Sequence, residues 1–131
     1  MGQLLGFDFI KTRNVLKRGL ELDGYNEELN LGFEFRGIQH YQYVSYFHKT
    51  IEGYQELIKR NYDKENQCVK KGIKLLIIPY WVEEESDESL IHFVKNWLTL
   101  NGIPFQKKEV SLQTINGLNF QNQNYEGTSS K

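Results

Sequence analysis

Two acidic residues stand where carboxylates could bind a metal ion. Asp23 closes the segment Leu20–Asp23, which predicts a short strand, and Glu34 lies inside the alternating segment Asn30–Arg36, which predicts a second strand. Because side chains alternate between the faces of a strand, two paired strands could bring both acids together. Mg²⁺ prefers a few carboxylate oxygens, and the bound ion can activate water against a phosphodiester. An ordinary hairpin with two solvent-facing acids is the alternative, and the spacing alone leaves it open.

The residues after Glu34 extend this candidate site. Gln39 and His40 place an amide and an imidazole just past the second strand, in a segment, Ile38–Val44, that is predicted to be extended. Imidazole titrates near neutral pH, so His40 could transfer a proton or hold a phosphate. A histidine among aromatic residues is also commonly a packed or surface residue, and this interpretation stays open.

Turn and strand signals around the two acids predict a hairpin. Gly24, Tyr25 and Asn26 supply turn chemistry between the two expected strands. The nearly all-apolar run Ile73–Ile78 is typical of a central strand buried on both faces. Residues 1–18 are mixed and predict no element.

Two amphipathic helices complete the predicted α/β fold, in which a mixed β-sheet is flanked by helices. The first helix covers 51–71, with Thr50 as its N-cap and Gly72 as its stop. The second covers Asp87–Leu100. We expect the core to include Phe33, Phe35, Leu57, Leu75, Ile77, Phe93 and Trp97.

The composition fits one soluble domain. The chain has 131 residues, of which 39% are hydrophobic, enough for a single core. We expect a folded domain over 1–110 and a polar, flexible tail over 111–131. The single cysteine, Cys68, excludes an internal disulfide and a cysteine-rich zinc site. No apolar run reaches the ~20 residues that span a bilayer, and the first residues lack the order of a signal peptide, so we expect an intracellular protein, cytoplasmic or nuclear.

The charge is unevenly distributed, although the net value is only −1. Residues 83–88 (EEESDE) are acidic, which leaves the rest of the chain net basic. Basic residues that could meet phosphates form two groups, Lys11, Arg13, Lys17 and Arg18 in one and Lys59, Arg60, Lys64, Lys70, Lys71 and Lys74 in the other. Composition alone is equally typical of a solvated surface.

The order of these motifs resembles a known family of nucleases. Residues 20–41 resemble the core of the Vsr-type (very-short-patch-repair) endonucleases, within the PD-(D/E)xK or restriction-endonuclease-like superfamily. Relatives of this kind carry LELDGY, then EEL, then a strand, then an acid followed by G-x-Q-H. The similarity continues through the pattern R-x-x-x-K-x-x-x-C at 60–68 and the strand segment Gly72–Tyr80. It covers most of the expected domain.

The resemblance implies a restriction-endonuclease-like core and hydrolysis of DNA phosphodiester bonds with Mg²⁺ or Mn²⁺. The metal ligands it implies are Asp23, Glu34 and the backbone carbonyl of Phe35. The catalytic residues it implies are Asp23, Glu34, Arg36, Gln39 and His40. Gln39 would orient water or metal, His40 would move a proton or steady the phosphate, and Arg36 would offset negative charge. The DNA contacts it implies are Arg60, Lys64, Lys11 and Arg13.

Three departures from the family pattern keep an alternative open. Asn61 stands where an acid is usual, a helix that precedes the matched region in relatives has no counterpart here, and no zinc-binding recognition module is encoded. The alternative is a catalytically degenerate domain that acts as a DNA-binding or assembly module. DNA is the expected partner in both cases, no membrane partner is expected, and a homodimer would suit an enzyme that cuts both strands.

Overall fold

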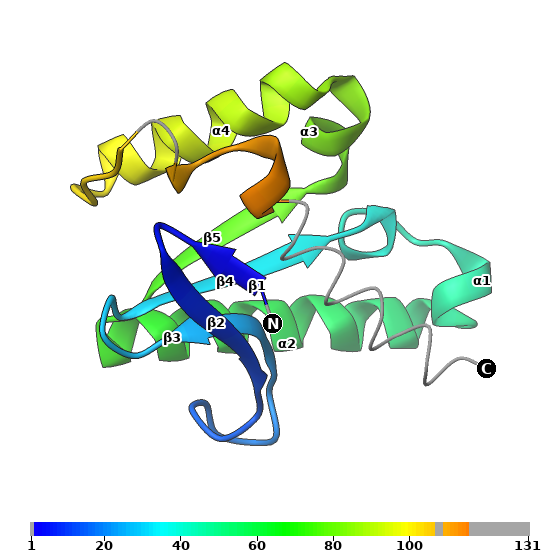
Figure 1. Ribbon diagram of the computed structural model, residues 1–131. Helices are drawn as coiled ribbons and strands as arrows, with labels where there is room; N and C mark the ends of the chain where they lie inside the picture. The colour runs from blue at the N-terminus through cyan, green and yellow to red at the C-terminus, as the bar shows by residue number, and fades with distance from the viewer. Residues whose placement is uncertain (1, 107–108, 116–131) are drawn as a thin grey trace.

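A five-stranded mixed sheet with helices on both faces forms the body of the protein (Figure 1). The computed structural model describes residues 2–106 and 109–115. The strands are β1 (Gly2–Leu4), β2 (Phe7–Thr12), β3 (Leu22–Asn26), β4 (Leu31–Arg36) and β5 (Lys74–Pro79). The helices are η1 (Ile38–His40), α1 (Ser45–His48), α2 (Ile51–Lys71), α3 (Tyr80–Glu85) and α4 (Asp87–Leu100). The mixed α/β fold class is therefore confirmed.

The sheet follows chain order, from β1 at one edge to β5 at the other. The strands β1 to β4 are antiparallel neighbours, whereas β5 runs parallel to β4. A parallel neighbour needs a long crossover, and α2 supplies it. In Figure 1, α2 lies on one side of the sheet, and α3 and α4 lie on the other.

Local signals explain both ends of α2. The Thr50 hydroxyl accepts a hydrogen bond from the backbone N–H of Gly53 at 3.0 Å, which is the N-cap that the sequence predicts. Gly72 ends the helix with φ +71°, a left-handed conformation that side chains disfavour. The predicted helices over 51–71 and Asp87–Leu100 are both confirmed.

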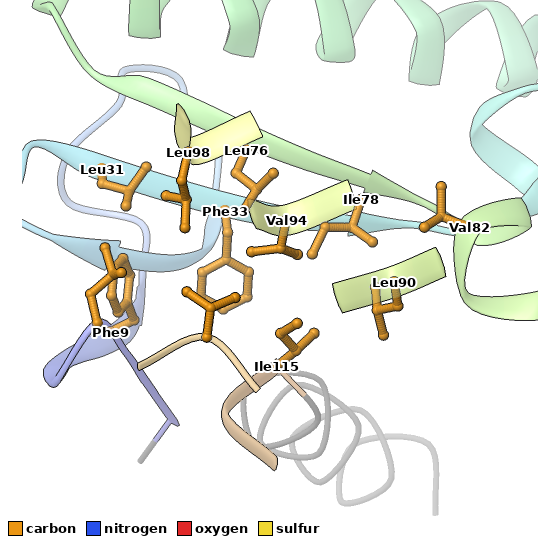
Figure 2. Close-up of a cluster of buried hydrophobic side chains, with 12 residues drawn as sticks. Phe9, Leu31, Phe33, Leu76, Ile78, Val82, Leu90, Val94, Leu98 and Ile115 are labelled. Carbon is orange, nitrogen blue, oxygen red and sulfur yellow. The ribbon is translucent and has the colours of Figure 1, made fainter. Parts of the chain in front are cut away.

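The main core lies between the sheet and α4 (Figure 2). Leu31 and Phe33 of β4 pack there, together with Leu76 and Ile78 of β5. The prediction that Leu75 and Ile77 belong to the core was one residue out of register, since both are only partly buried. An apolar strand does not reveal which of its faces meets the better-packed layer. Of the other expected core residues, Phe33 is buried, while Phe35, Leu57, Phe93 and Trp97 are partly buried.

Two predictions around the hairpin were wrong. Gly24 is not in a turn: it lies inside β3, where a Cβ atom would come within 1.6 Å of the Phe33 ring. The strand predicted over Leu20–Asp23 is accordingly shifted to Leu22–Asn26, and the turn follows it. The segment Ile38–Val44, predicted to be extended, instead begins with η1 and a turn, and α1 starts directly after it at Ser45.

The segment before β3 and the segment after α4 both pack onto the domain. Residues 1–18 predicted no element, yet they contribute β1 and β2 and the buried Phe9. Ile115 is fully buried in the main core, inside the segment expected to be a tail. The rest of that expected tail, 116–131, lies outside the described residues. Within the described part of the chain, no helix combines the length and apolarity needed to cross a membrane.

Candidate functional site

Asp23 and Glu34 meet where β3 and β4 begin to separate. The two strands pair Gly24 with Phe33, so the next step along the register sets Asp23 opposite Glu34. At this step the Asp23 carboxylate accepts a hydrogen bond from the backbone N–H of Phe35 at 3.0 Å. The side chain thus takes up a backbone donor of β4 at the end of the β3–β4 ladder, which fixes the carboxylate beside Glu34.

The burial of Asp23 and its closeness to Glu34 shift the pKa of Asp23. Burial, and after it the neighbouring Glu34 carboxylate, raise the pKa of Asp23 to about 7 from its ordinary 3.8. The Phe35 N–H and the ammonium groups of Lys64 and Lys11 oppose the rise. A carboxyl with this pKa is poised between its two charge states at neutral pH, and a cation bound beside it would favour the ionised form.

Glu34 is almost completely buried and is held by two cations. Only 3% of its surface is exposed, and its carboxylate pairs with the guanidinium of Arg36 at 2.5 Å and with the ammonium of Lys64. Lys64 comes from α2, which crosses this face of the sheet. A buried carboxylate needs such partners, because an unpaired charge in the interior is strongly unfavourable.

Arg36 lies at the end of β4, also buried, between two acids. Its Nε donates to Glu34, and its Nη1 donates to Glu65 of α2 at 2.8 Å. Its remaining terminal nitrogen, Nη2, is buried and donates to no group among the described residues. A buried guanidinium N–H without an acceptor is unusual, and an anion such as a phosphate would satisfy it.

His40 follows in η1 and contacts Asn61 of α2. The side-chain Nδ2 of Asn61 lies 3.3 Å from the imidazole Nδ1. An amide nitrogen can only donate, so Nδ1 accepts and Nε2 carries the proton in the neutral ring. Burial, the largest effect, lowers the pKa of His40, and Arg36 and Lys64 lower it further, whereas Glu34 and the hydrogen bond with Asn61 raise it. The lowered pKa favours the neutral ring, which carries one N–H.

A hollow of about 190 Å³ lies beside these groups, and we refer to it as the site hollow. Its walls come from β4, η1 and α2, and they are formed by Arg36, His40, Ile58, Asn61, Tyr62 and Glu65. It is large enough for a phosphate group with water around it.

The other predicted site residues divide into two groups. Arg60 is exposed and lines a second hollow of about 280 Å³, the middle hollow, together with Lys64. Lys11 and Arg13 instead bind the Glu21 carboxylate, at 3.4 and 3.0 Å. Lys11 still lies close enough to affect the pKa of Asp23.

Gln39 lies apart from the two acids in its contacts. Its side-chain oxygen folds back over Gly37, where a Cβ atom would lie 2.5 Å away, and its backbone oxygen contacts the His48 ring at 2.7 Å. Among the described residues its side chain makes no hydrogen bond to Asp23 or Glu34.

The chemistry of the donors at this site fits a small hard cation. Mg²⁺ is commonly held by one or two carboxylates and keeps several waters, which matches the pair Asp23 and Glu34. In a strand, the N–H and C=O of one residue point to the same edge, so the Phe35 carbonyl points to the edge where Asp23 lies. Across the described ranges no cluster of three or more acidic, histidine or cysteine side chains is present, so a site here would rest on two carboxylates.

Two residues of the site were not anticipated as partners. Glu65 holds Arg36, and Asn61 orients His40, whereas Asn61 had been noted only as a departure from the family pattern. Both lie on α2, at spacings that give no sign of which strand residue they meet. Only the crossing of α2 over β4 pairs them with the site.

Three viral proteins are similar to this chain. It is 47% identical over 85 residues to uncharacterized protein 094L of frog virus 3 (isolate Goorha), an alignment that covers 60% of this chain and 54% of that protein. It is 35% identical over 65 residues to uncharacterized protein 307L of invertebrate iridescent virus 6, covering 50% and 33%. It is 33% identical over 69 residues to uncharacterized protein 033L of invertebrate iridescent virus 3, covering 53% and 36%.

The chain thus spans between 33% and 54% of the length of these relatives. No family model matches the chain. No solved structure matches it either. The printed names of the three relatives give no activity, so an assignment has to rest on the site itself.

Proposed function

We propose that this chain is a metal-dependent endonuclease with a restriction-endonuclease-like fold, which hydrolyses DNA phosphodiester bonds with Mg²⁺ or Mn²⁺. The observation that carries the proposal is the meeting of Asp23 and Glu34 at one point of the sheet, next to the buried guanidinium of Arg36, whose Nη2 has no acceptor among the described residues. The motif resemblance described above implies the same two acids. The mixed sheet, with the α2 crossover between β4 and β5, is compatible with that fold.

Asp23 and Glu34, with the Phe35 carbonyl, would hold the cation. When bound, the ion would lower the pKa of a water molecule and stabilise the negative charge that develops on the phosphate. In the net reaction a water oxygen would form a new P–O bond, one P–O bond of the backbone would break, and the proton released by the water would balance the proton taken up by the leaving oxygen. In the metal-free protein Lys64 and Arg36 neutralise Glu34, so binding requires the Lys64 ammonium to move away from that carboxylate.

Arg36 and His40 would bind the phosphate in the site hollow. The unsatisfied Nη2 of Arg36 is a donor for a phosphate oxygen and would offset charge in the transition state. Because the Asn61 amide holds His40 Nδ1, the ring offers its Nε2–H. This arrangement favours His40 as a donor to the phosphate or to the leaving oxygen over His40 as a base.

The test is plasmid nicking with Mg²⁺ or Mn²⁺ by the wild type and by Asp23→Asn and Glu34→Gln. These substitutions keep the shape of each side chain, and circular dichroism checks that the variants fold. We expect each to lower the cutting rate at least about a hundredfold, since a metal ligand supplies several kcal/mol to the transition state. Glu28→Gln, at an exposed turn acid, is the matched control. Wild-type rates in both site variants would overturn the proposed site.

A second candidate function is a degenerate, non-enzymatic DNA-binding or assembly module. The ion pairs of Glu34 with Lys64 and Arg36 favour it, because they satisfy the carboxylate without a metal. Calorimetry with Mn²⁺ separates the two proposals. A nuclease site takes up the ion and loses that affinity in Asp23→Asn, whereas a degenerate module shows no uptake in the wild type.

A further inference from the structure

A third hollow, of about 330 Å³, lies beside the carboxyl end of α2, and we refer to it as the basic hollow. Its lining residues are Lys17, Arg18, Gln67, Lys70 and Lys71. All of them except Gln67 are cationic. Half of these cations come from the segment between β2 and β3 and half from α2, so residues about fifty positions apart in sequence meet here.

The segment that carries Lys17 is fixed in place by a buried amide. The Gln67 side-chain oxygen accepts from the Lys17 N–H at 2.7 Å, and its nitrogen donates to the Lys17 carbonyl at 3.3 Å. Gln67 itself is buried. Just below it, Leu16 and Leu20 pack with Cys68 of α2 in a second apolar cluster. The position of the cations therefore does not depend on a freely moving loop.

Arg18 is held separately. Its guanidinium makes two hydrogen bonds to Asp63, and its backbone adopts φ +64°, which is uncommon for a residue with a side chain. The pKa of Asp63 is lowered mainly by its hydrogen bonds with Arg18 and Gln67. The nearby charge of Lys70 lowers it to a smaller extent. Asp63 thus offsets the charge of Arg18 directly and that of Lys70 more weakly.

The remaining positive charge is not balanced by acids. Neither Lys17 nor Lys71 forms an ion pair with any acid in the described ranges. Lysines in the last turn of a helix commonly offset its dipole, which accounts for Lys70 and Lys71. That explanation does not cover Lys17, which another part of the chain brings to the same place.

The three hollows follow one another along α2. The site hollow and the middle hollow share His40 and Asn61, and the middle hollow and the basic hollow share Arg18. Asn61 and Lys71 are ten residues apart on α2, which corresponds to about 15 Å along the helix axis. Successive phosphates of one DNA strand advance about 3.4 Å along the duplex, so on a duplex that lies along α2 this separation corresponds to about four base pairs.

We propose that the basic hollow binds a backbone phosphate of the DNA substrate, about four base pairs from the bond that is cut. The inference rests on the proposed function for its substrate class and adds a contact outside the site. The phosphate would lie between Lys17 and Lys71, with Lys70 and Arg18 adding charge around it. Such a contact carries no base sequence and would set how the duplex lies along α2.

The test compares DNA binding by the wild type and by the double variant Lys17→Gln/Lys71→Gln, without a divalent ion. Fluorescence anisotropy with a short labelled duplex gives the affinity at several salt concentrations. Each phosphate contact adds about 0.9 to the steepness with which log K falls as log[salt] rises. We expect the slope of log K against log[salt] to be shallower by about 1 in the double variant. We also expect this variant to bind DNA about tenfold more weakly than the wild type at low salt.

The control is Lys59→Gln/Lys95→Gln, which removes the same charge from lysines that line none of the three hollows. Thermal unfolding checks that both double variants stay folded. Equal salt dependence in the wild type and Lys17→Gln/Lys71→Gln, in a protein that still nicks plasmid, would overturn the basic hollow and leave the proposed function standing. A wild type that neither binds DNA in this assay nor nicks plasmid with Mg²⁺ or Mn²⁺ overturns both.

Discussion

The two faces of β4 differ in what they contribute to the molecule. Toward α4 the strand presents Leu31 and Phe33, which lie in the main apolar core. Toward α2 the same strand presents Glu34 and Arg36, which are buried against charged side chains. One face stabilises the fold by removing apolar surface from water. The other holds charges whose burial opposes folding unless each has a partner.

The difference between the two faces of β4 means that a buried side chain does not always belong to the apolar core. Glu34 and Phe33 are about equally buried, at 3% and 2% exposure. The neighbours of Phe33 in the core are apolar and make packing contacts with it, including an edge-to-face contact with the Phe9 ring. Glu34 has charged neighbours, Lys64 and Arg36, and replacing either one removes an ion-pair partner from a buried carboxylate. Substitutions on the two faces should therefore fail in different ways.

The largest effect is expected on the apolar face. Phe33→Ala should lower the free energy of unfolding by about 3–5 kcal/mol, because it removes a buried ring and leaves a cavity. Urea denaturation followed by fluorescence measures the loss. Phe47→Ala, at a half-exposed phenylalanine, is the control and should change stability by less than about 0.5 kcal/mol. Similar losses in the two variants would remove the distinction between Phe33 and a surface ring.

On the charged face, the effects of two substitutions on the free energy of unfolding should be coupled, whereas Phe33→Ala on the apolar face only removes packing. Glu34→Gln and Arg36→Met should each cost about 2–4 kcal/mol, since each removes one of the two ion-pair partners of a buried ion. The double variant should cost clearly less than the sum, because it removes both ions together. The measurement is a double-mutant cycle of unfolding free energies. Additive losses would show that Glu34 and Arg36 act independently, against the 2.5 Å contact between them.

Asp23 should give the metal-free protein an unusual dependence of stability on pH. The unfolded carboxyl ionises near 3.8 and the folded one at about 7, so the folded chain binds more protons between these values. The free energy of unfolding therefore falls as pH rises through this window and levels off above it, by on the order of 2 kcal/mol once solvent screening is included. Asp23→Asn should lose this dependence, whereas Glu28→Gln should keep it. An unchanged profile in Asp23→Asn would contradict the raised pKa.

The smallest expected effect concerns the imidazole at the edge of the charged face. Asn61→Asp places a carboxylate beside His40 Nδ1 and should raise the pKa of His40, because the negative charge favours the imidazolium. Titration of the ring by nuclear magnetic resonance measures it. Asn61→Leu, which removes the hydrogen bond without adding charge, should leave the pKa low. Equal values in the two variants would mean that Asn61 does not contact the ring in solution.

Local patterns were sufficient for the two long helices, α2 and α4. The apolar spacing over 51–71, the Thr50 cap and the Gly72 stop each act within a few residues, so they predict α2 without knowledge of the rest of the chain. The pattern of α4 is equally local, and its buried residues are Leu90, Val94 and Leu98. The apolar run of β5 was likewise found to within one residue.

The strands near the site depended on partners distant in sequence. Gly24 is typical of a turn when considered alone, and only the Phe33 ring above it explains why a strand needs glycine there. The N-terminal strands have little signal of their own, because their pairing supplies the stabilisation that their composition lacks. Ile115, inside the segment expected to be a tail, lies in the main core, and a polar composition gives no sign of such a contact with distant residues.

The sequence by itself determined which residues are candidates for the proposed chemistry. Asp23, Glu34, Arg36 and His40 were expected from residue type, strand alternation and the family resemblance of the ordered motifs. Only the tertiary structure decided what each of them contacts: Lys64 and Arg36 on Glu34, Asn61 on His40, and Lys17 beside Lys71. Alternation and capping are properties of a few consecutive residues, whereas the ion pairs depend on how α2 crosses the sheet. That crossing is set by the packing of the whole domain.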